Sequence, residues 1–203
     1  MIVRVGQLCG GENGCWNIKE WLPSIVQAAP VLGCLPSDDR VRIYVFYFIE
    51  TDRDVQDIDW IPSNVAASAM IDFMFGVEDQ VLHLVHPRTV SWSSVASILA
   101  QKLSVQLVPL SDWVNKLELL ATDNDPHQLH LSALQLLPSY REMATAKSGN
   151  AFGTYKLDTK RARASSAQIL ASEHLRPIGE NQVATWFEYW KTKGTLVLDH
   201  ADS

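Results

Sequence analysis

The stretch Arg4-Val5-Gly6-Gln7-Leu8-Cys9-Gly10 decides how the rest of this sequence is interpreted. Its apolar residues predict a short strand over positions 2–8 that ends in glycines. The segment Asn13-Gly14-Cys15-Trp16-Asn17 follows with the composition of a loop, and an apolar helical pattern comes after it. Strand, glycine-containing loop and helix in this order are typical of an α/β protein.

Length and charge limit the classes of function. The chain has 203 residues, 47% of them hydrophobic, and a formal net charge of −6. This length suits one domain or one part of a larger domain. The acidic balance argues against a nucleic-acid partner, because phosphate binding needs a basic surface. Residues 156–163 are a local basic exception, which we interpret as a solvated helix face.

Cysteine usage and apolar runs bear on location. Cys9, Cys15 and Cys34 fit neither a disulfide framework nor zinc-ligand spacing, so reduced thiols are expected. The start of the chain lacks a signal-peptide pattern, and the longest apolar run, residues 43–49, is too short to span a membrane. We therefore expect a cytoplasmic location and no membrane partner.

Hydrophobic periodicity predicts an alternation of strands and helices. Helical spacing occurs over residues 16–32, 63–75 and 91–103. A fourth helix is predicted to begin at position 111 or 112, and a fifth to run through position 137. The last predicted helix carries Val183, Trp186, Phe187 and Trp190. Short apolar runs predict strands at 80–86 and 105–109, and Pro62 favours extended backbone over 57–61. Ser63 or Asn64 is the expected cap of the helix over 63–75. The predicted fold class is α/β, with helices dominating the later part.

A series of landmarks follows the same order as in a known family. They are Arg4-Val5-Gly6-Gln7-Leu8 with Gly10, Asn13-Gly14-Cys15-Trp16-Asn17 with Trp21-Leu22-Pro23, Leu32-Gly33-Cys34-Leu35-Pro36, Asp59-Trp60-Ile61-Pro62, Leu82-His83-Leu84-Val85-His86-Pro87, Val108-Pro109-Leu110 with Asp112-Trp113-Val114, Leu157-Asp158-Thr159-Lys160, and Trp186-Phe187-Glu188-Tyr189-Trp190. The set resembles the thioester reductase domain that closes carboxylic acid reductases and the nonribosomal-peptide-synthetase-like reductases of fungi. No single landmark is decisive, but together they span nearly the whole chain.

The resemblance implies an architecture. The chain would be the C-terminal portion of an extended Rossmann-type reductase of the short-chain dehydrogenase superfamily, with a helical substrate-binding subdomain. Residues 1–203 would form one partial thioester reductase domain, made of a core strand and loop (1–10), a substrate-side helix and insertion (11–56), returning core strands and helices (57–120), and a helical C-terminal subdomain (121–203).

The resemblance also implies an activity. Such domains use NADPH to release a carrier-bound acyl group, held as a phosphopantetheine thioester, as an aldehyde or alcohol. The family binds NADPH on a glycine-rich turn and moves the proton with a Tyr-x-x-x-Lys pair. Neither stands at the corresponding place in this sequence, and we expect both to lie upstream of Met1. The chain is then expected to hold no catalytic residue, to be inactive alone and to act with an acyl carrier domain.

The resemblance leaves a few residues as candidates near the reaction. The backbone of Gly6, Gln7 and Leu8 would lie beside the nicotinamide of the cofactor, where glycine allows close approach. The alternative is a strand end that needs glycine for a turn. The acyl pocket would be lined by Trp16, Asn17, Trp21 and Trp60. Core packing is an equal alternative for Trp21, and a purely structural place is the alternative for Trp60.

Several other patterns have simpler interpretations. Gly10-Gly11-x-x-Gly14 has the wrong spacing for a phosphate loop and is interpreted as a turn. Tyr189-x-x-x-Lys193 repeats the spacing of the catalytic pair on the last helix, where the order of segments makes it a chance match. The pairs His83/His86 and His127/His130 lack further ligands at suitable spacing, so we expect no metal site.

Residues 41–56 depart from the family pattern, which passes almost directly from Leu35-Pro36 to Asp59-Trp60. One hypothesis is a retained intron, since valine codons begin with GT, glutamine can be CAG, and the 16 residues preserve the reading frame. The alternative is an ordinary hairpin insertion. Transcript reads that always contain the segment would contradict the intron hypothesis.

A second class of function stays open beside the reductase. A non-catalytic interaction module could bind a carrier protein or partner subunit through its helical C-terminal region and exposed apolar surface. A stable, soluble monomer would favour this module. Aggregation would favour part of an enzyme, because open sheet edges promote association. The pattern leaves the oligomeric state open.

Overall fold

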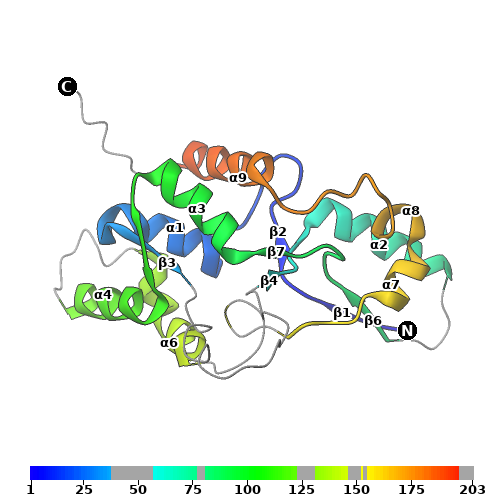
Figure 1. Cartoon of the computed structure of the whole chain (residues 1–203), viewed down its shortest axis with the longest axis horizontal. Helices are drawn as coiled ribbons and strands as arrows, with labels where there is room; N and C mark the ends of the chain where they lie inside the picture. Colours follow the sequence, from blue (N-terminus) through cyan, green and yellow to red (C-terminus); the bar gives the residue numbers. More distant parts are fainter. Residues whose placement is uncertain (38–56, 77–80, 123–130, 146–151, 153–154, 197–203) are drawn as a thin grey trace, which may run out of the picture.

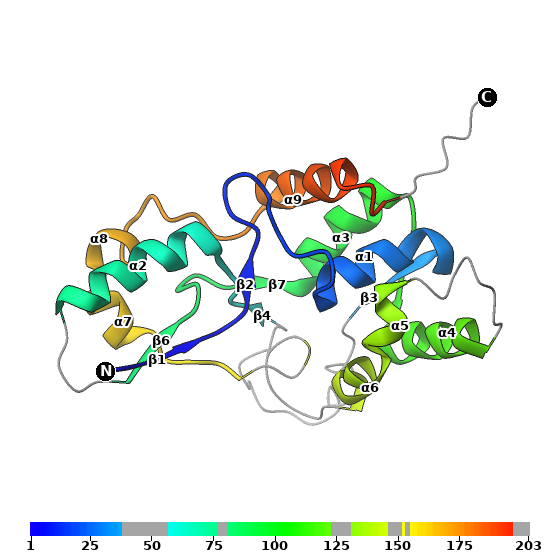
Figure 2. The ribbon, with the colours of Figure 1, turned by 180° about the vertical axis from the view of Figure 1, so that it is seen from behind.

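The computed structural model describes residues 1–37, 57–76, 81–122, 131–145, 152 and 155–196 (Figure 1). The segment 41–56, with its intron hypothesis, and the pair His127/His130 therefore lie outside the described residues. The described part is elongated, with a small parallel strand pair at one end and a larger helical body at the other (Figures 1 and 2). An apolar cluster lies at each end.

The smaller cluster forms around two parallel strands with register Ile2↔Val81 to Val5↔Leu84. Its elements are β1 (Ile2–Val5), β6 (Val81–Leu84), α2 (Ser63–Gly76), α7 (Lys160–Ser165) and α8 (Ala167–Leu170). Leu82 and Leu84 of β6 pack against Phe73 of α2, and all three side chains are fully buried. The predicted strand over 80–86 and helix over 63–75 are confirmed. Ser63 is the first helical residue rather than a cap, because the helix begins directly after Pro62.

The predicted strand over residues 2–8 is divided into two pieces. The Gly6 amide still donates to Leu84 O (3.0 Å), but Gln7 O accepts from the Ile61 amide (3.0 Å). The chain thus changes its partner strand between these residues, since successive residues of an extended chain point to opposite sides. After the change β2 (Leu8–Cys9) runs parallel to β5 (Ile61–Pro62). Close by, β4 (Asp57–Ile58) pairs antiparallel with β7 (Val90–Ser91).

The larger cluster is mainly helical. It contains α1 (Trp21–Leu32), α3 (Trp92–Leu103), α4 (Leu110–Thr122), α9 (Glu180–Thr192) and the parallel pair β3 (Cys34–Ser37) and β8 (Gln106–Pro109). Gly33 ends α1 in the left-handed conformation (φ 67°), and Ser91 caps α3 by accepting from the Ser94 amide (3.3 Å). The helix predicted over 16–32 begins only at Trp21, because local turns around Asn13 and Asn17 occupy the preceding residues.

The single helix predicted through residue 137 is wrong. Two short helices, α5 (Ser132–Gln135) and α6 (Leu137–Thr145), meet at Leu136 instead. The Tyr140 hydroxyl of α6 donates to Trp21 O (2.7 Å), which joins this pair to the start of α1. The interpretation of residues 156–163 as a solvated helix face is confirmed over α7, where Lys160, Arg161 and Arg163 are exposed.

Packing crosses the predicted subdomain boundaries. Elements between residues 92 and 122 join α1 and α9 in the larger cluster, whereas α7 and α8, from the late part of the chain, join β1 and β6. The boundaries at 10, 56 and 120 remain predictions. Among the described helices, none has the length and apolar character needed to cross a membrane.

His86 and Arg88, in the loop after β6, form hydrogen bonds with the backbone of residues 172–176. The Arg88 guanidinium donates to the carbonyl oxygens of Ser172 (3.1 Å), Glu173 (3.2 Å) and Leu175 (2.6 Å). His86 Nδ1 accepts from the Arg88 amide (3.1 Å), so its Nε2 donates to Arg176 O (3.1 Å). The ring is buried and held as the neutral tautomer. Burial lowers its pKa below the usual 6.5.

Acidification is expected to weaken this attachment. Because the folded-state pKa of His86 lies below its unfolded value, the stability that it contributes is full above about pH 6.5 and is lost as pH falls through the interval between the two pKa values. Urea unfolding at pH 7.5 and pH 5, followed by circular dichroism, should show a smaller pH effect in His86→Gln, which keeps a donor but no titratable ring. Equal pH effects in the two proteins would contradict this assignment.

Candidate functional site

Gly6 and Gln7 lie where the two strand pairs meet, just beyond the carboxyl end of β1. In open α/β sheets, ligands bind outside the carboxyl ends of parallel strands. The predicted cofactor-binding residues Gly6, Gln7 and Leu8 therefore occupy a position that suits a ligand. Leu8 is exposed, and Gly6 and Gln7 are half-buried.

The Gln7 side chain joins this position to the start of α1. Its Nε2 donates to Leu8 O (2.6 Å) and to Glu20 Oε2 (3.1 Å), and its Oε1 accepts from Trp21 Nε1 (2.9 Å). Glu20 Oε2 also accepts from Trp16 Nε1 (2.9 Å). One amide and one carboxylate thus fix the orientation of two indoles. We call Gln7, Glu20, Trp16, Trp21 and Trp60 the Gln7 network.

Trp60 completes the Gln7 network through ring contacts. It lies edge-on to Trp16 (centroids 5.8 Å apart, 78° between planes) and to Trp21 (5.3 Å, 82°), the geometry that aromatic pairs prefer. Trp16 and Trp60 are buried, whereas Trp21 keeps partial exposure. The aromatic contacts continue from Trp21 to Phe152 (4.8 Å). Trp21 is therefore the tryptophan of the Gln7 network that a ligand reaches most readily.

Asn17 stands apart from the other predicted substrate-binding residues. Its side chain is exposed, and its Oδ1 accepts from the Lys19 amide (3.1 Å). Its carbonyl oxygen accepts from the Glu20 amide (3.0 Å), so Asn17 shapes the turn before α1. The structure brings Trp16, Trp21 and Trp60 together with Gln7. Their binding roles remain predictions.

Glu20 is the member of the Gln7 network that sequence reasoning missed. It is the residue before α1 and lies four positions after Trp16. An acidic residue directly before Trp21 and four positions after Trp16 was a usable signal, because indole N–H groups need an acceptor when they are buried. Phe152 was missed as well, since no periodic pattern surrounds it.

Gly6 is explained by packing within the chain. A Cβ atom at this position would overlap Val85 Cγ1, so the close approach of the strand to Val85 requires glycine. This observation supports the structural alternative at Gly6 and leaves the cofactor role a prediction.

A double-mutant cycle can test the packing explanation. Gly6→Ala is expected to cost about 2 kcal/mol of unfolding free energy, because the added methyl group overpacks the site. Val85→Ala removes the obstructing group, so the double variant should be more stable than the sum of the single effects predicts, by about 1 kcal/mol. Urea unfolding measures all four proteins. Strict additivity would show that the two side chains do not compete for space.

The glycine pattern at positions 10–14 forms a turn, as predicted. The Gly14 amide donates to Gly11 O (2.8 Å). Gly10 O accepts from Trp186 Nε1 (3.2 Å), and a Cβ at Gly10 would overlap the same indole. Gly10 and Gly14 are therefore packed against α9, whereas Gly11 faces Ser63 and Asn64 at the start of α2.

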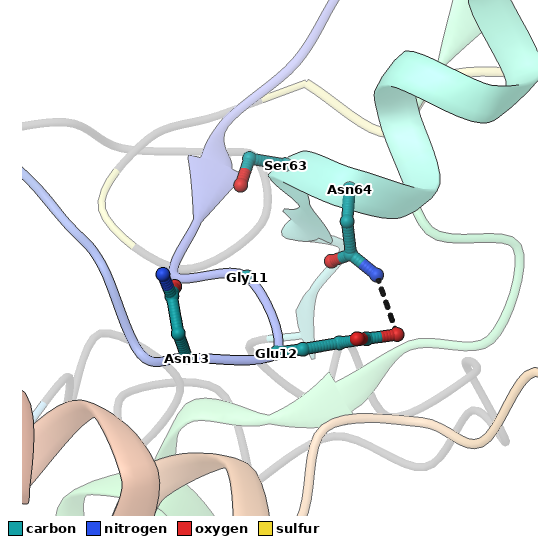
Figure 3. Close-up of a pocket in the computed structure, with 5 residues that line it drawn as sticks. All are labelled: Gly11, Glu12, Asn13, Ser63 and Asn64. Atoms are coloured by element: carbon teal, nitrogen blue, oxygen red, sulfur yellow. Dashed lines mark hydrogen bonds between the residues drawn. The ribbon is translucent and has the colours of Figure 1, made fainter.

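A shallow polar pocket of about 400 Å³ lies between this turn and the start of α2 (Figure 3). The side chains of Glu12 and Asn64 face each other across it, and Asn64 Nδ2 donates to Glu12 Oε1 (3.3 Å). Gly11, Asn13 and Ser63 complete the lining. No member of the Gln7 network lines this pocket.

The titratable side chains near the turn do not form an activated nucleophile. Burial raises the pKa of the Cys9 thiol, which keeps it protonated. The Cys15 Sγ atom lies 3.3 Å from the Tyr189 hydroxyl oxygen, and this interaction raises the pKa of the phenol. A catalytic tyrosine of a reductase needs the opposite shift. Lys193 Nζ lies 5.5 Å from the Tyr189 ring centroid, so this pair forms a surface contact.

The imidazoles of His83 and His86 both contact backbone carbonyl oxygens. His83 Nδ1 lies 3.1 Å from Asp158 O, and His86 is held as described above. Across the described residues, no three His, Cys, Asp or Glu side chains gather in a way that could hold a metal ion.

No family model matches the chain. It is 37% identical over 204 residues to the adenylate-forming reductase Nps10 of Heterobasidion annosum, a match that covers 95% of this chain and 17% of that protein. The chain therefore spans about a sixth of the length of this relative.

Solved structures share the fold. The terminal R domain from the myxalamid PKS-NRPS biosynthetic pathway superposes with a TM-score of 0.67 at 17% identity, covering 97% of this chain and 44% of that domain. A thiolation-reductase di-domain from an archaeal nonribosomal peptide synthetase superposes with a TM-score of 0.58 at 13% identity, covering 95% of this chain and 36% of that one. The α/β fold of part of a Rossmann-type reductase is thus confirmed. The chain is thus similar to a part of an adenylate-forming reductase and, in fold, to a part of the terminal reductase domains of nonribosomal peptide synthetases.

Proposed function

We propose that the chain is the substrate-side part of an NADPH-dependent reductase that releases a carrier-bound acyl thioester as an aldehyde or alcohol. The names of the relatives support a reductase, and the thiolation-reductase di-domain supports a carrier domain as partner. The Gln7 network is the observation that carries the proposal. It joins the carboxyl end of β1 to a half-exposed indole in one hydrogen-bonded arrangement.

In this proposal, segments other than the described residues form the principal NADPH site. The glycines that could approach a pyrophosphate closely, Gly10 and Gly14, are packed against Trp186 and Thr185. The space at Gly6 is filled by Val85. Other segments must therefore hold most of the cofactor, which supplies the hydride when bound. The role left to this chain is to position the acyl group against Trp21 and to exclude water with the buried rings of Trp16 and Trp60.

A chimera tests the proposed function. This chain replaces the matching segment of the Heterobasidion annosum relative, and NADPH-dependent aldehyde formation from a carrier-bound thioester is measured. The chimera should be active. Trp21→Ala should lower kcat/KM about tenfold, because a positioning surface is lost. Leu119→Ala, at a highly exposed residue of α4, is the matched control and should change nothing. A soluble chimera that binds NADPH but forms no product would refute the proposal.

Titration of the isolated chain with NADPH tests whether the chain binds the cofactor by itself, as a complete reductase would. We expect no binding at micromolar concentration, since Gly10 and Gly14 are packed against α9 and the sequence has no glycine-rich cofactor turn of the family's spacing. Micromolar binding would show that the chain holds its own cofactor site.

The interaction module remains the second candidate, and one observation favours it. Large apolar side chains of β1 and α2 are exposed in the described structure. An interaction module and an enzyme part both account for this surface, and product formation by the chimera decides between them.

A further inference from the structure

Four aromatic rings beside Gln7 form a closed cycle of contacts. Trp21 contacts Trp60 (centroids 5.3 Å apart) and Phe152 (4.8 Å). Trp92 contacts the same two rings, Phe152 at 4.8 Å and Trp60 at 5.9 Å. We call Trp21, Trp60, Trp92 and Phe152 the four-ring cluster. The phenyl ring of Phe152 is thus flanked by two indoles, and Trp21 connects it to Gln7.

The three indoles of the four-ring cluster are held by the fold. Trp21 and Trp92 are the first residues of α1 and α3, and Trp60 lies between β4 and β5. Trp21 Nε1 donates to Gln7 Oε1 (2.9 Å), and Trp92 Nε1 donates to Pro36 O (3.1 Å). Each of these two hydrogen bonds fixes the orientation of its ring, so the indoles form a rigid frame around the phenyl ring.

Phe152 occupies this frame in an unfavourable backbone conformation. Its φ is 59°, in the left-handed region where the Cβ atom of a non-glycine residue is crowded. Its side chain is nevertheless buried. Residues with such backbone persist where their surroundings favour them, and they gather at ligand sites. The phenyl ring carries no polar atom, so it contributes only its shape and apolar surface to the four-ring cluster.

We propose that Phe152 determines the specificity for the acyl group, because its ring fills a phenyl-sized space between Trp21 and Trp92 and so limits the acyl group to a small aliphatic chain. This inference rests on the proposed function, in which the acyl group lies against Trp21. An acyl group that extends beyond Trp21 meets the ring of Phe152. Without that ring, the space between the two indoles suits the flat apolar ring of an aryl group.

Benzene is the probe for the phenyl-sized space, and the isolated chain is sufficient for this test. Phe152→Gly removes the ring, and glycine adopts the left-handed backbone without strain. An enclosed apolar cavity stays dry and binds benzene. Near-saturating benzene should therefore raise the Tm of Phe152→Gly by about 3 °C and leave the Tm of the parent unchanged. No shift in Phe152→Gly, or equal shifts in both proteins, would overturn the inference.

The chimera described above tests specificity. NADPH-dependent aldehyde formation is measured with a carrier-bound acetyl thioester and a carrier-bound benzoyl thioester. Phe152→Gly and Phe152→Ala should each raise the ratio of kcat/KM for benzoyl over acetyl about tenfold, because the aryl group enters the vacated space. Phe187→Ala is the matched control, since it removes a similarly buried phenyl ring from α9, outside the four-ring cluster. It should leave the ratio unchanged.

The two kinds of failure are distinguishable. If the parent chimera is active but the Phe152 variants keep its benzoyl-to-acetyl ratio, or if Phe187→Ala raises the ratio equally, the inference is wrong while the proposed function stands. If the parent chimera reduces neither thioester, the proposed function is wrong and the inference falls with it.

Discussion

Gly14→Ala is expected to lower the free energy of unfolding by about 3 kcal/mol, whereas Gly33→Ala should lower it by about 1 kcal/mol. Both glycines have left-handed backbone, with φ of 72° and 67°. A Cβ at Gly33 meets no atom, so only the backbone conformation is unfavourable there. At Gly14 it would overlap the carbonyl group of Thr185 in α9, and backbone cannot move aside as a flexible side chain does.

Comparing the two variants therefore separates the free-energy cost of the left-handed backbone from the cost of overlap between the added Cβ atom and α9. Urea unfolding followed by circular dichroism gives both values, and Gly33→Ala is the matched control for the left-handed geometry. If the two variants lost the same stability, the turn over residues 11–14 would have to be less tightly packed on α9 than we describe.

Trp186→Ala is expected to lower the free energy of unfolding by about 4 kcal/mol. The indole is fully buried in α9, contacts Trp16 edge-on (5.0 Å) and donates to Gly10 O (3.2 Å). Truncation therefore leaves a large cavity and a buried carbonyl oxygen without its donor. The same loss should loosen the turn at Gly10, which connects α9 to the end of β2.

Two control variants accompany this prediction. Leu119→Ala changes a side chain that is 69% exposed and should stay within about 0.5 kcal/mol of the parent protein. Trp186→Phe keeps an aromatic ring but no donor, so it should fall between the parent and Trp186→Ala. A Trp186→Ala protein as stable as Leu119→Ala would mean that α9 is not anchored through this indole.

Periodic segments of the sequence were sufficient to predict much of the fold. The spacing of Val183, Trp186, Phe187 and Trp190 predicted α9, because one apolar stripe decides a helix that packs on a core. Gly33 likewise predicted the end of α1. Helix ends that are set by a glycine or a serine cap could therefore be predicted, because the residues that set them are local in the sequence.

Features that depend on distant partners were not recoverable. The division of the first strand follows from a change of partner between Leu84 and Ile61, which no local pattern reports. The break between α5 and α6 was missed for the same reason, since α5 packs against α1 whereas α6 packs against α4.

The candidate site shows the same limit. The resemblance selected Trp16, Trp21, Trp60 and Gln7, and the structure brings these residues together. Sequence reasoning missed the side chain that links them, Glu20: its place four positions after Trp16 was a usable local signal, but its bond to Gln7, 13 positions away, has none.

The position of the tryptophans has an optical consequence. All seven belong to or pack against the larger cluster, and the smaller cluster around β1 and β6 contains none. Intrinsic fluorescence therefore reports on only one end of the molecule, and a melting of the strand pair at the other end produces no change in emission. A comparison of emission with circular dichroism would reveal whether the two ends unfold as one unit, and labelling β1 with an external dye would make the silent end visible.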